Sequence, residues 1–161
     1  MFSDPVKNIE QCGIQAGMEI ADFGSGSGHY SLTSAKALVS TGRVYSIDIN
    51  KDLLTKLKNN ASREGLYNVE VIWGDIEKPN GTKLRDQTID LVIMSNILFQ
   101  VENKTGVINE AKRILKQSGR VLVVDWSDSF GGIGPAPKDV FKKDVAMSTF
   151  EKAGFHLDRE I

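Results

Sequence analysis

Three glycines alternate with serines in the stretch Gly24–Gly28 (GSGSG), and an aspartate, Asp22, stands two residues before the first of them. Glycine adopts positive φ angles and has no Cβ, so the main chain of such a turn can approach a ligand closely. A helix that begins just after the turn, near His29, would aim its free N–H groups at that ligand. A single glycine would indicate chain geometry only, whereas three in alternation predict a ligand-binding turn.

Two more aspartates follow predicted strands. Asp48 ends the run RVYSID, where a carboxylate can accept hydrogen bonds from both hydroxyls of a ribose. Asp75 follows Gly74 after the next strand, where it can accept the exocyclic amine of an adenine while the Ile76 N–H faces a ring nitrogen. Plainer interpretations exist, because Asp48 or Asn50 can cap the next helix and Asp75 can be a solvated loop residue. Acids at the ends of three successive strands make coincidence a weaker explanation.

The elements that must position these residues alternate along the chain. We expect strands at Glu19–Phe23, Arg43–Ile49, Val69–Trp73, Ile89–Met94, Arg120–Asp125 and Phe155–Ile161. We expect helices at His29–Ser40, Lys51–Glu64, Lys104–Lys116 and Asp139–Ala153. Most of the strands are continuous apolar runs, which is typical of parallel strands buried on both faces. The pattern predicts a three-layer α/β/α fold of the Rossmann-like, doubly wound type, with a mostly parallel sheet and helices on both faces.

Two polar or flexible connections interrupt the alternation. Lys78–Gln87 is predicted to be a loop with at most one short helical turn. Ser127–Lys138 holds three glycines and two prolines and follows a strand directly. Long loops at the carboxyl ends of strands often carry function, so this loop, with Trp126 and Phe130, is our expected acceptor pocket and mobile lid. A merely connecting loop is an equally good interpretation.

Composition narrows the classes of protein. The 161 residues suit one domain, 1–161, and the net charge of −1 gives no global field toward nucleic acid. The one cysteine, Cys12, suits a reducing cytosol, and no apolar run approaches the length of a membrane helix, so we expect a cytoplasmic protein with no membrane partner. No His/Cys cluster has the spacing of metal ligands, so we expect no metal site. The oligomeric state is not indicated.

The sequence Asp22–Gly28, DFGSGSG, resembles the D/E-x-G-x-G-x-G motif of class I S-adenosylmethionine-dependent methyltransferases. IDLVIMSNILFQV resembles their segment running past the sulfonium, and ILKQSGRVLVVD resembles their L-K-x-x-G-x-x-x-x-x-D motif. The chain looks most like the small ubiquinone-biosynthesis-type and type 11 members. The resemblance implies S-adenosylmethionine as cofactor and S-adenosylhomocysteine as product. It implies a cofactor site made of Asp22, Phe23, Gly24, Ser25, Gly26, Ser27, Gly28, Tyr30, Asp48, Ile49, Asn50, Gly74, Asp75, Ile76, Ser95 and Asn96.

The implied reaction is methyl transfer to an acceptor that the motifs do not identify. A small molecule is favoured over nucleic acid because the net charge is close to zero. Alignment supplies much of the rate of such a transfer, and a general base helps when the acceptor must lose a proton. The catalytic residues are not identified, and the candidates for a base are His29, Tyr30, Asp125 and Ser127–Ser129.

Some reactions are disfavoured, and other classes of protein stay open. Ser95–Leu98 (SNIL) stands where enzymes that methylate amide or base nitrogens often carry N/D-P-P-Y, and Cys12 lies too near the N-terminus for pyrimidine C5 chemistry. The alternatives are a nicotinamide-dependent oxidoreductase, a non-catalytic cofactor-binding domain and an RNA methyltransferase. The G-x-G-x-x-G pattern of the first would need glycine where His29 stands.

The main departure from the family lies at the C-terminus. The family's sheet has a sixth strand and an antiparallel seventh strand inserted beside the fifth. Phe155–Ile161 resembles the sixth, and the antiparallel strand is absent from this sequence. A missing strand leaves backbone edges unpaired, so we expect residues to be missing from the sequence rather than a six-stranded protein.

Overall fold

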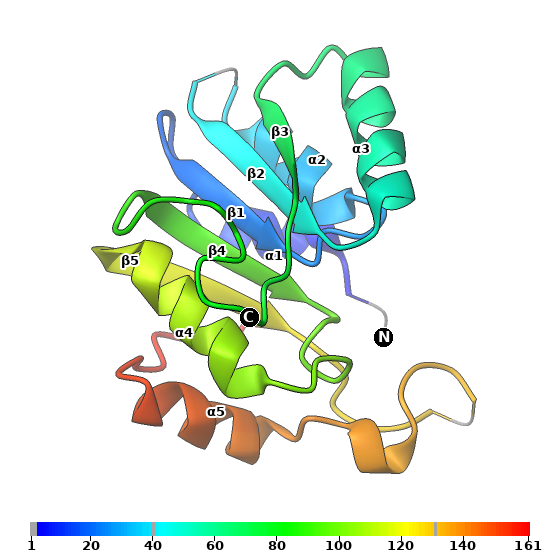
Figure 1. The fold of residues 1–161 in the computed structure, drawn as a ribbon, viewed down its shortest axis with the longest axis vertical. Helices are drawn as coiled ribbons and strands as arrows, with labels where there is room; N and C mark the ends of the chain where they lie inside the picture. Colours follow the sequence, from blue (N-terminus) through cyan, green and yellow to red (C-terminus); the bar gives the residue numbers. More distant parts are fainter. Residues whose placement is uncertain (1–2, 40, 131) are drawn as a thin grey trace.

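A five-stranded parallel sheet forms the centre of the chain (Figure 1). The structure, a computed structural model, describes residues 3–39, 41–130 and 132–161. The strand order is β3-β2-β1-β4-β5, and every neighbouring pair is parallel. Because β1 lies between β2 and β4, the order reverses at β1, and ligands of such sheets bind at the carboxyl ends of the strands beside that reversal. The strands are β1 Glu19–Phe23, β2 Arg43–Asp48, β3 Val69–Trp73, β4 Ile89–Ser95 and β5 Leu115–Val124.

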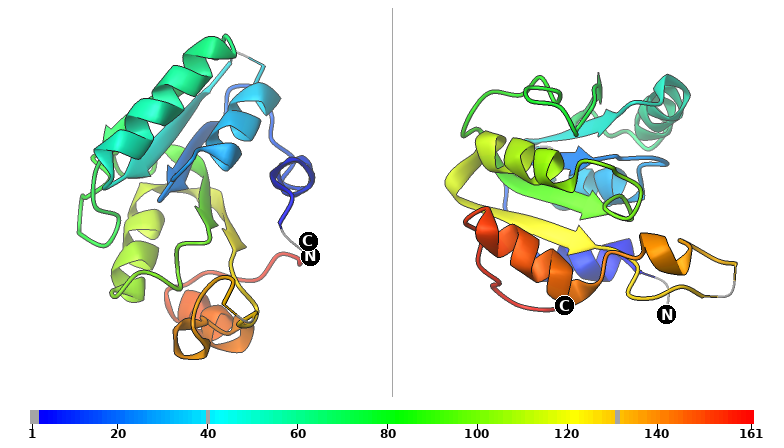
Figure 2. Two further views of the ribbon diagram at one scale, coloured as in Figure 1. Left: turned by 90° about the vertical axis from the view of Figure 1, so that its right-hand side faces the viewer. Right: turned by 60° about the horizontal axis from the view of Figure 1, so that its bottom comes forward.

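Helices cover both faces of the sheet, as predicted. In Figure 2 the sheet separates α1 and α2 from α4, and α5 lies beyond α4 near the β5 edge. The predicted end of the second helix, Ser40, lies outside the described residues. Among the described residues, no helix has the length and apolar character that crossing a bilayer requires. The helices are α1 Pro5–Gln11, α2 His29–Ala37, α3 Lys51–Arg63, α4 Lys104–Ile114 and α5 Lys143–Lys152, with a short 3₁₀ turn at Pro137–Asp139.

Alternate residues of the central strands fill two separate cores. Leu91 and Ile93 of β4 pack in the cluster on the α1/α2 face, whereas Val92 and Met94 pack in the cluster on the α4 face. All four side chains are buried. Full burial of such a side chain contributes about 1.5–3 kcal/mol, so the continuous apolar run is the main force that holds β4 between two helical layers.

Helix α1 ends at Cys12, whose side chain is buried in the core on the α1/α2 face. Burial raises the pKa of the Cys12 thiol, and the nearby charges of Arg120 and Arg159 only partly oppose that shift. Burial and the raised pKa both make the thiol less reactive, as is usual for a structural cysteine.

The fifth strand begins earlier than predicted and carries an irregularity. Leu115 pairs with Ile89 and Arg120 pairs with Leu91, so the register shifts between the two pairs. The intervening residues 116–119 bulge out of the ladder. The residues between the predicted helix Lys104–Lys116 and the predicted strand Arg120–Asp125 therefore form a bulge inside β5. The strand ends at Val124 rather than at Asp125.

Two predictions near the C-terminus are wrong. Helix α5 begins at Lys143 and not at Asp139, and Phe155–Ile161 forms no strand. The Phe155 N–H donates to the Phe150 carbonyl, and the two rings lie 5.7 Å apart in the core on the α4 face. A strand needs a neighbouring ladder, and no strand among the described residues pairs with this segment. Its polar side chains bond elsewhere, since Glu160 pairs with Lys143 at 2.5 Å. Within the described residues the sheet also has no antiparallel strand.

Candidate cofactor-binding site

The glycine-rich turn joins β1 to α2 and is bonded to the end of β2. The N–H groups of Gly24 and Ser25 both donate to the Ile47 carbonyl, at 2.8 and 3.1 Å. Gly28 is the N-cap of α2 with φ +84°, and no side chain caps that helix. The Ser31 N–H bonds Asp22, so the N–H groups of His29 and Tyr30, at the very start of α2, are those that could face a ligand, as the glycine spacing predicts.

Gly26 sits at the point of the turn where a side chain would enter the cavity. Its φ is +53°, and the nearest atom to an added Cβ is the Gly24 carbonyl oxygen at 3.9 Å. Gly28 differs, because a Cβ there would lie 2.6 Å from two carbon atoms of Leu57. Gly28 lets α3 pack against the turn, whereas Gly26 keeps space open for a ligand.

Asp22 is a buried carboxylate beneath the turn. Its Oδ2 accepts a hydrogen bond from the Ser31 hydroxyl at 2.6 Å, and that hydroxyl lies 2.7 Å from the Ser46 hydroxyl. Burial raises the pKa of Asp22 to about 6, the charge of Asp48 adds to the rise, and the hydrogen bond from Ser31 opposes it. A cation in the cavity would favour the ionised form, so the site is suited electrostatically to a positively charged ligand.

The structure separates the two interpretations of Asp48. Asn50 caps α3, because its Oδ1 accepts the N–H groups of Asp52 and Leu53 at 3.0 and 3.2 Å. The Asp48 carboxylate instead accepts the Gly26 N–H at 2.9 Å and the Asn50 N–H at 2.9 Å, one on each oxygen. An ionised carboxylate has about four acceptor positions, so about two remain for ligand hydroxyls.

Asp75 begins a tight loop after β3. Its Oδ1 accepts the Glu77 N–H at 3.0 Å, which fixes a local turn. The preceding Gly74 N–H donates to the Asp48 carbonyl at 3.1 Å, so the ends of β2 and β3 are joined. A Cβ on Gly74 would lie 2.2 Å from the Gly81 carbonyl oxygen, so the loop closes on itself at this point.

The chain after β4 turns sharply at Asn96. This residue has φ +55°, its N–H donates to the Val124 carbonyl at 2.7 Å, and its own carbonyl accepts Gln100 Nε2 at 2.7 Å. A non-glycine residue in the left-handed region is uncommon and is concentrated at functional sites. The turn is thereby fixed to the end of β5.

Asp125 stabilises the turn that follows β4. One carboxylate oxygen accepts the Leu98 N–H at 2.8 Å and the other accepts the Trp126 N–H at 2.8 Å. Burial raises the pKa of Asp125, and these main-chain hydrogen bonds partly oppose the rise. The side chain lines neither cavity described below. The geometry therefore favours a structural role over that of a general base.

One cavity of about 850 Å³ collects these features at the carboxyl edge of the sheet. Its walls include Asp22, Gly24, Ser25, Gly26, Ser27, Tyr30, Asp48, Ile49, Asn50, Gly74, Asp75, Ile76, Ser95 and Asn96 from the predicted set. Phe23 and Gly28 lie behind the wall. The cavity also includes nine residues outside the predicted set, namely Ser3, Pro5, His29, Ile47, Leu53, Glu77, Ile97, Gln100 and Val101.

Some of these additional residues carried a usable signal in the sequence. Ile47 directly precedes Asp48, and Glu77 follows Asp75 by two residues, so both could have been found by extending the motifs. Ser3 and Pro5 carried none, since they reach the cavity through α1. That helix is fixed by Tyr30, whose hydroxyl accepts Asn8 Nδ2 at 2.8 Å and lies 2.5 Å from the Ser3 hydroxyl.

A second cavity of about 630 Å³ adjoins the first and shares Gln100 and Val101 with it. It opens between the loops that follow β4 and β5, and its remaining walls are Phe99, Glu102, Lys104, Lys138, Asp139, Val140 and Phe141. The Lys104 ammonium donates to the Val101 carbonyl at 2.8 Å and lies 5.4 Å from the centre of the Phe141 ring.

Trp126 and Phe130, which we expected to form the acceptor pocket, line neither of these two cavities, and their place in acceptor binding stays a prediction. Their rings lie 5.9 Å apart and pack on each other, and Phe130 remains 53% exposed. Of the described residues in the predicted loop Ser127–Lys138, Lys138 alone lines a cavity. Gly131 of that loop lies outside the described residues.

Solved structures of other proteins have the same architecture as this chain. A methyltransferase from Aquifex aeolicus that depends on S-adenosylmethionine superposes with a TM-score of 0.86 at 28% identity, over 97% of this chain and 81% of its own. A [4+2]-cyclase superposes with a TM-score of 0.78 at 18% identity, over 93% of this chain and 55% of its own, and that likeness shows the fold alone. Fold and site together define the class I S-adenosylmethionine-dependent methyltransferase type.

The family follows from the sequence comparison. The model of a methyltransferase domain matches residues 14–153, and the chain therefore belongs to that family. A ubiquinone/menaquinone biosynthesis C-methyltransferase of Hydrogenovibrio crunogenus is 32% identical over 120 residues, which are 74% of this chain and 46% of that protein. The chain spans about half the length of such relatives. These matches do not favour the oxidoreductase and RNA-directed alternatives.

Proposed function

We propose that this chain binds S-adenosylmethionine in the larger cavity and transfers its methyl group to a small-molecule acceptor. The observation that carries the proposal is the convergence of a bare main-chain turn with two aspartates in one cavity of about 850 Å³. Pockets of roughly 300–1,000 Å³ are usual for small molecules and cofactors. Membership of the methyltransferase domain family supports it.

The residues present suit this cofactor. Gly26 leaves open the space that a side chain would fill, and the buried hydroxyl of Ser25 has no hydrogen-bond partner among the described residues. Asp48 keeps acceptor positions after bonding the main chain. A buried polar group without a partner is costly, so the free Ser25 hydroxyl supports a ligand at this point.

Several of the predicted residues can then be assigned to parts of the cofactor. Asp48 would accept the ribose hydroxyls, and Asp75 with the Ile76 N–H would hold the adenine. The glycine turn and the start of α2 would face the amino-acid part of the cofactor, above the buried Asp22. Ser95 and Asn96 line the cavity at the end of β4, on the side toward the second cavity.

The bound cofactor supplies a methyl group already activated by the positive charge on sulfur. The chain's own residues hold this cofactor and align the acceptor, and alignment alone can contribute several kcal/mol to the rate, on the order of 7–11 for well-oriented groups. The Tyr30 hydroxyl is engaged by Ser3 and Asn8, so its role is to fix the N-terminal wall of the cavity.

The second cavity is the proposed acceptor site. It shares Gln100 and Val101 with the cofactor cavity, so an acceptor there would lie next to the cofactor. Phe99, Val140 and Phe141 add apolar side chains to a lining that is mainly polar, and Lys104 adds a cation at the edge, so an acceptor with both apolar and polar groups would suit it. The name of the Hydrogenovibrio relative points to a quinone precursor, which is the type of acceptor we would test first. Action in the cytoplasm remains a prediction from composition.

The experiment begins with titration calorimetry of S-adenosylhomocysteine and of NAD against the purified chain. We expect saturable binding of the first and none of the second. Incubation with S-adenosylmethionine and a panel of quinols, phenols and other small acceptors, followed by mass spectrometry, should show a product heavier by one methylene. A chain that fails to bind S-adenosylhomocysteine would refute the proposal. Binding without transfer to any acceptor would favour a non-methylating role, and salt-sensitive transfer to RNA would favour the nucleic-acid alternative.

A further inference from the structure

The residues on either side of the segment Phe99–Glu102 donate their main-chain N–H groups to two carboxylates, which belong to different parts of the molecule. All four of its residues line the second cavity. At its start, the Leu98 N–H donates to Asp125, which directly follows β5. At its end, the Asn103 N–H donates to Glu77 Oε1 at 2.7 Å. The first anchor is part of the sheet edge, whereas the second stands on the loop that carries Asp75.

Glu77 is joined to Asn103 by more than one contact. Its main-chain carbonyl accepts Asn103 Nδ2 at 3.4 Å, and Asn103 Oδ1 accepts the Gly106 N–H at 2.9 Å as the N-cap of α4. A Cβ on Gly106 would lie 2.5 Å from the Glu77 carbonyl oxygen, so a glycine is needed for this approach. A hydrogen bond to an ionised carboxylate is stronger than a neutral one. Glu77 therefore fixes both the segment and the start of α4.

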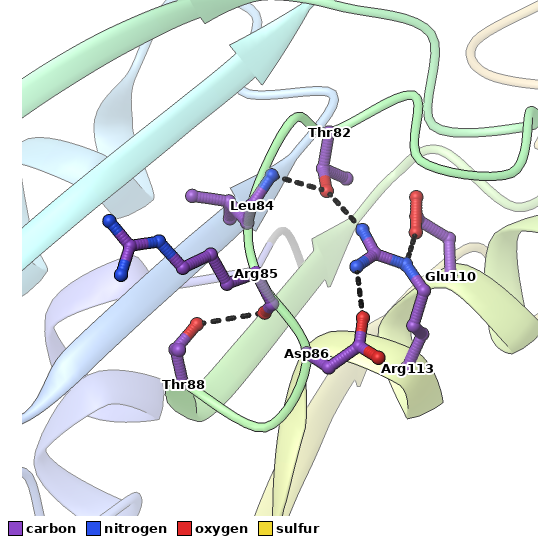
Figure 3. Close-up of polar contacts among 7 residues, drawn as sticks. All are labelled: Thr82, Leu84, Arg85, Asp86, Thr88, Glu110 and Arg113. Carbon is purple, nitrogen blue, oxygen red and sulfur yellow. Dashed lines mark hydrogen bonds and ion pairs between the residues drawn. The ribbon is translucent and has the colours of Figure 1, made fainter.

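The rest of the same loop is attached to the far end of α4 (Figure 3). Arg113 donates to Asp86 at 2.7 Å, to Thr82 at 3.4 Å and to the buried Glu110 at 2.5 Å. The loop is thus held along α4 at both ends. Asn103 bonds Glu77 directly, so a displacement at Asp75–Glu77 would reach Asn103 without passing through the far half of the loop.

Glu77 also faces the cofactor cavity, whose wall runs through Gly74, Asp75, Ile76 and Glu77. We propose that Glu77 is a positioning residue that couples occupancy of the adenosyl end of the cofactor cavity to the shape of the second cavity. A ligand held by Asp75 and Ile76 restrains Glu77, which in turn orders Phe99–Glu102 through Asn103. The inference rests on the proposed function, and it means that a bound cofactor improves the acceptor site. Such coupling is reciprocal in free energy, so an acceptor would tighten cofactor binding by the same factor.

Hydrogen–deuterium exchange tests this coupling without knowledge of the acceptor. S-Adenosylhomocysteine should slow exchange in the peptide covering residues 98–104 of the wild-type chain by about threefold to tenfold, the range expected for a modest coupling. In Glu77→Ala the same ligand should still bind, but the slowing in that peptide should disappear. Glu77→Gln keeps an oxygen acceptor for the Asn103 N–H and should recover part of the slowing, which a general loss of structure would not do.

Asp86→Ala is the matched control, because it removes an acid from the far end of the same loop. It should retain the ligand-dependent slowing at residues 98–104. Equal slowing in Glu77→Ala and wild type, or no slowing in the wild type despite bound S-adenosylhomocysteine, would overturn the coupling and leave the proposed function intact. Failure of the wild type to bind S-adenosylhomocysteine in calorimetry would remove both. If Glu77→Ala does not fold, Glu77→Gln decides, since full wild-type slowing together with unchanged Asn103 exchange would contradict the role of the carboxylate.

Discussion

The two cavities of this molecule are built by different means. The cofactor cavity rests on main-chain groups at the ends of β1, β2 and β3, fixed to one another by bonds such as Gly24 N–H to Ile47 carbonyl at 2.8 Å. The second cavity is bounded by side chains from the longer loops after β4 and β5, among them Phe99, Lys104 and Phe141. A ligand recognised by main chain requires glycines and strand ends at fixed spacing, whereas one recognised by side chains leaves the sequence free to vary.

This difference explains why the cofactor cavity can be placed from sequence and the second cavity cannot. Main-chain recognition leaves a motif, and side-chain recognition in irregular loops leaves only residue types. The predictions below test that division, beginning with the variant expected to have the largest effect.

Gly26→Val should abolish cofactor binding. The valine side chain would occupy the open space beside the turn, and S-adenosylhomocysteine affinity should fall by at least about 1,000-fold, or about 4 kcal/mol. Calorimetry measures the loss. Gly13→Val is the matched control, because Gly13 has φ +61° with nothing within 4 Å of an added Cβ and lies outside the cavity. It carries similar backbone strain but should bind normally, and equal loss of binding in both variants would contradict a steric role for Gly26.

Asp22→Asn should remove a pH dependence of stability. Because folding raises the pKa of Asp22 from 3.8 to about 6, the folded chain binds a proton more tightly, and this stabilisation is lost as pH rises through about 6. The free energy of unfolding of Asp22→Asn, relative to wild type, should therefore increase by about 2–3 kcal/mol from about pH 4 to about pH 7. Urea unfolding at a series of pH values provides the measurement.

Ser31→Ala should change the pH dependence of stability in the direction opposite to that of Asp22→Asn. The Ser31 hydroxyl opposes the rise in the pKa of Asp22, so its removal should steepen the fall in stability with pH. Parallel stability curves for wild type and Asp22→Asn would show that the carboxylate is not buried as described.

Asp48→Ala should weaken S-adenosylhomocysteine binding by about 30-fold, or about 2 kcal/mol, because hydrogen bonds to a charged acceptor are each worth about 1.5–3 kcal/mol. The chain should still fold, since Asn50 and not Asp48 caps α3. Asp48→Asn retains one acceptor oxygen and should fall between wild type and alanine. Unchanged affinity in the alanine variant, measured by calorimetry, would exclude Asp48 from the ribose role.

Phe141→Ala and Lys104→Met should have the smallest effect on the cofactor. Both residues line the second cavity and neither lines the first, so S-adenosylhomocysteine affinity should stay within about twofold of wild type. Methyl transfer to any acceptor found in the screen should drop instead. A large loss of cofactor affinity in either variant would mean that these two side chains also support the cofactor cavity directly.

The sequence predicted the sheet, both helical layers and most of the cofactor wall, because apolar runs and glycine spacing are local signals. It failed at Phe155–Ile161, where the apolar residues suggest a strand but Phe155 packs on Phe150 and no neighbouring strand is available. Composition also cannot show that the rings of Trp126 and Phe130 pack on each other, away from the two cavities described. Glu77 could have been placed in the cavity wall by extending the motif past Asp75, but its hydrogen bond with Asn103, 26 residues away, leaves no local signal.

Because the Cys12 side chain is buried beside α1, the reactivity of its thiol can report on movement of that helix. The Cys12 thiol is buried in the core on the α1/α2 face, so we expect a maleimide to label it faster when α1 moves away from α2. Ser3 and Pro5, on the same N-terminal segment, line the larger cavity. If a bound cofactor restrains this segment, S-adenosylhomocysteine should slow the labelling of Cys12, and an unchanged rate would show that the two are independent.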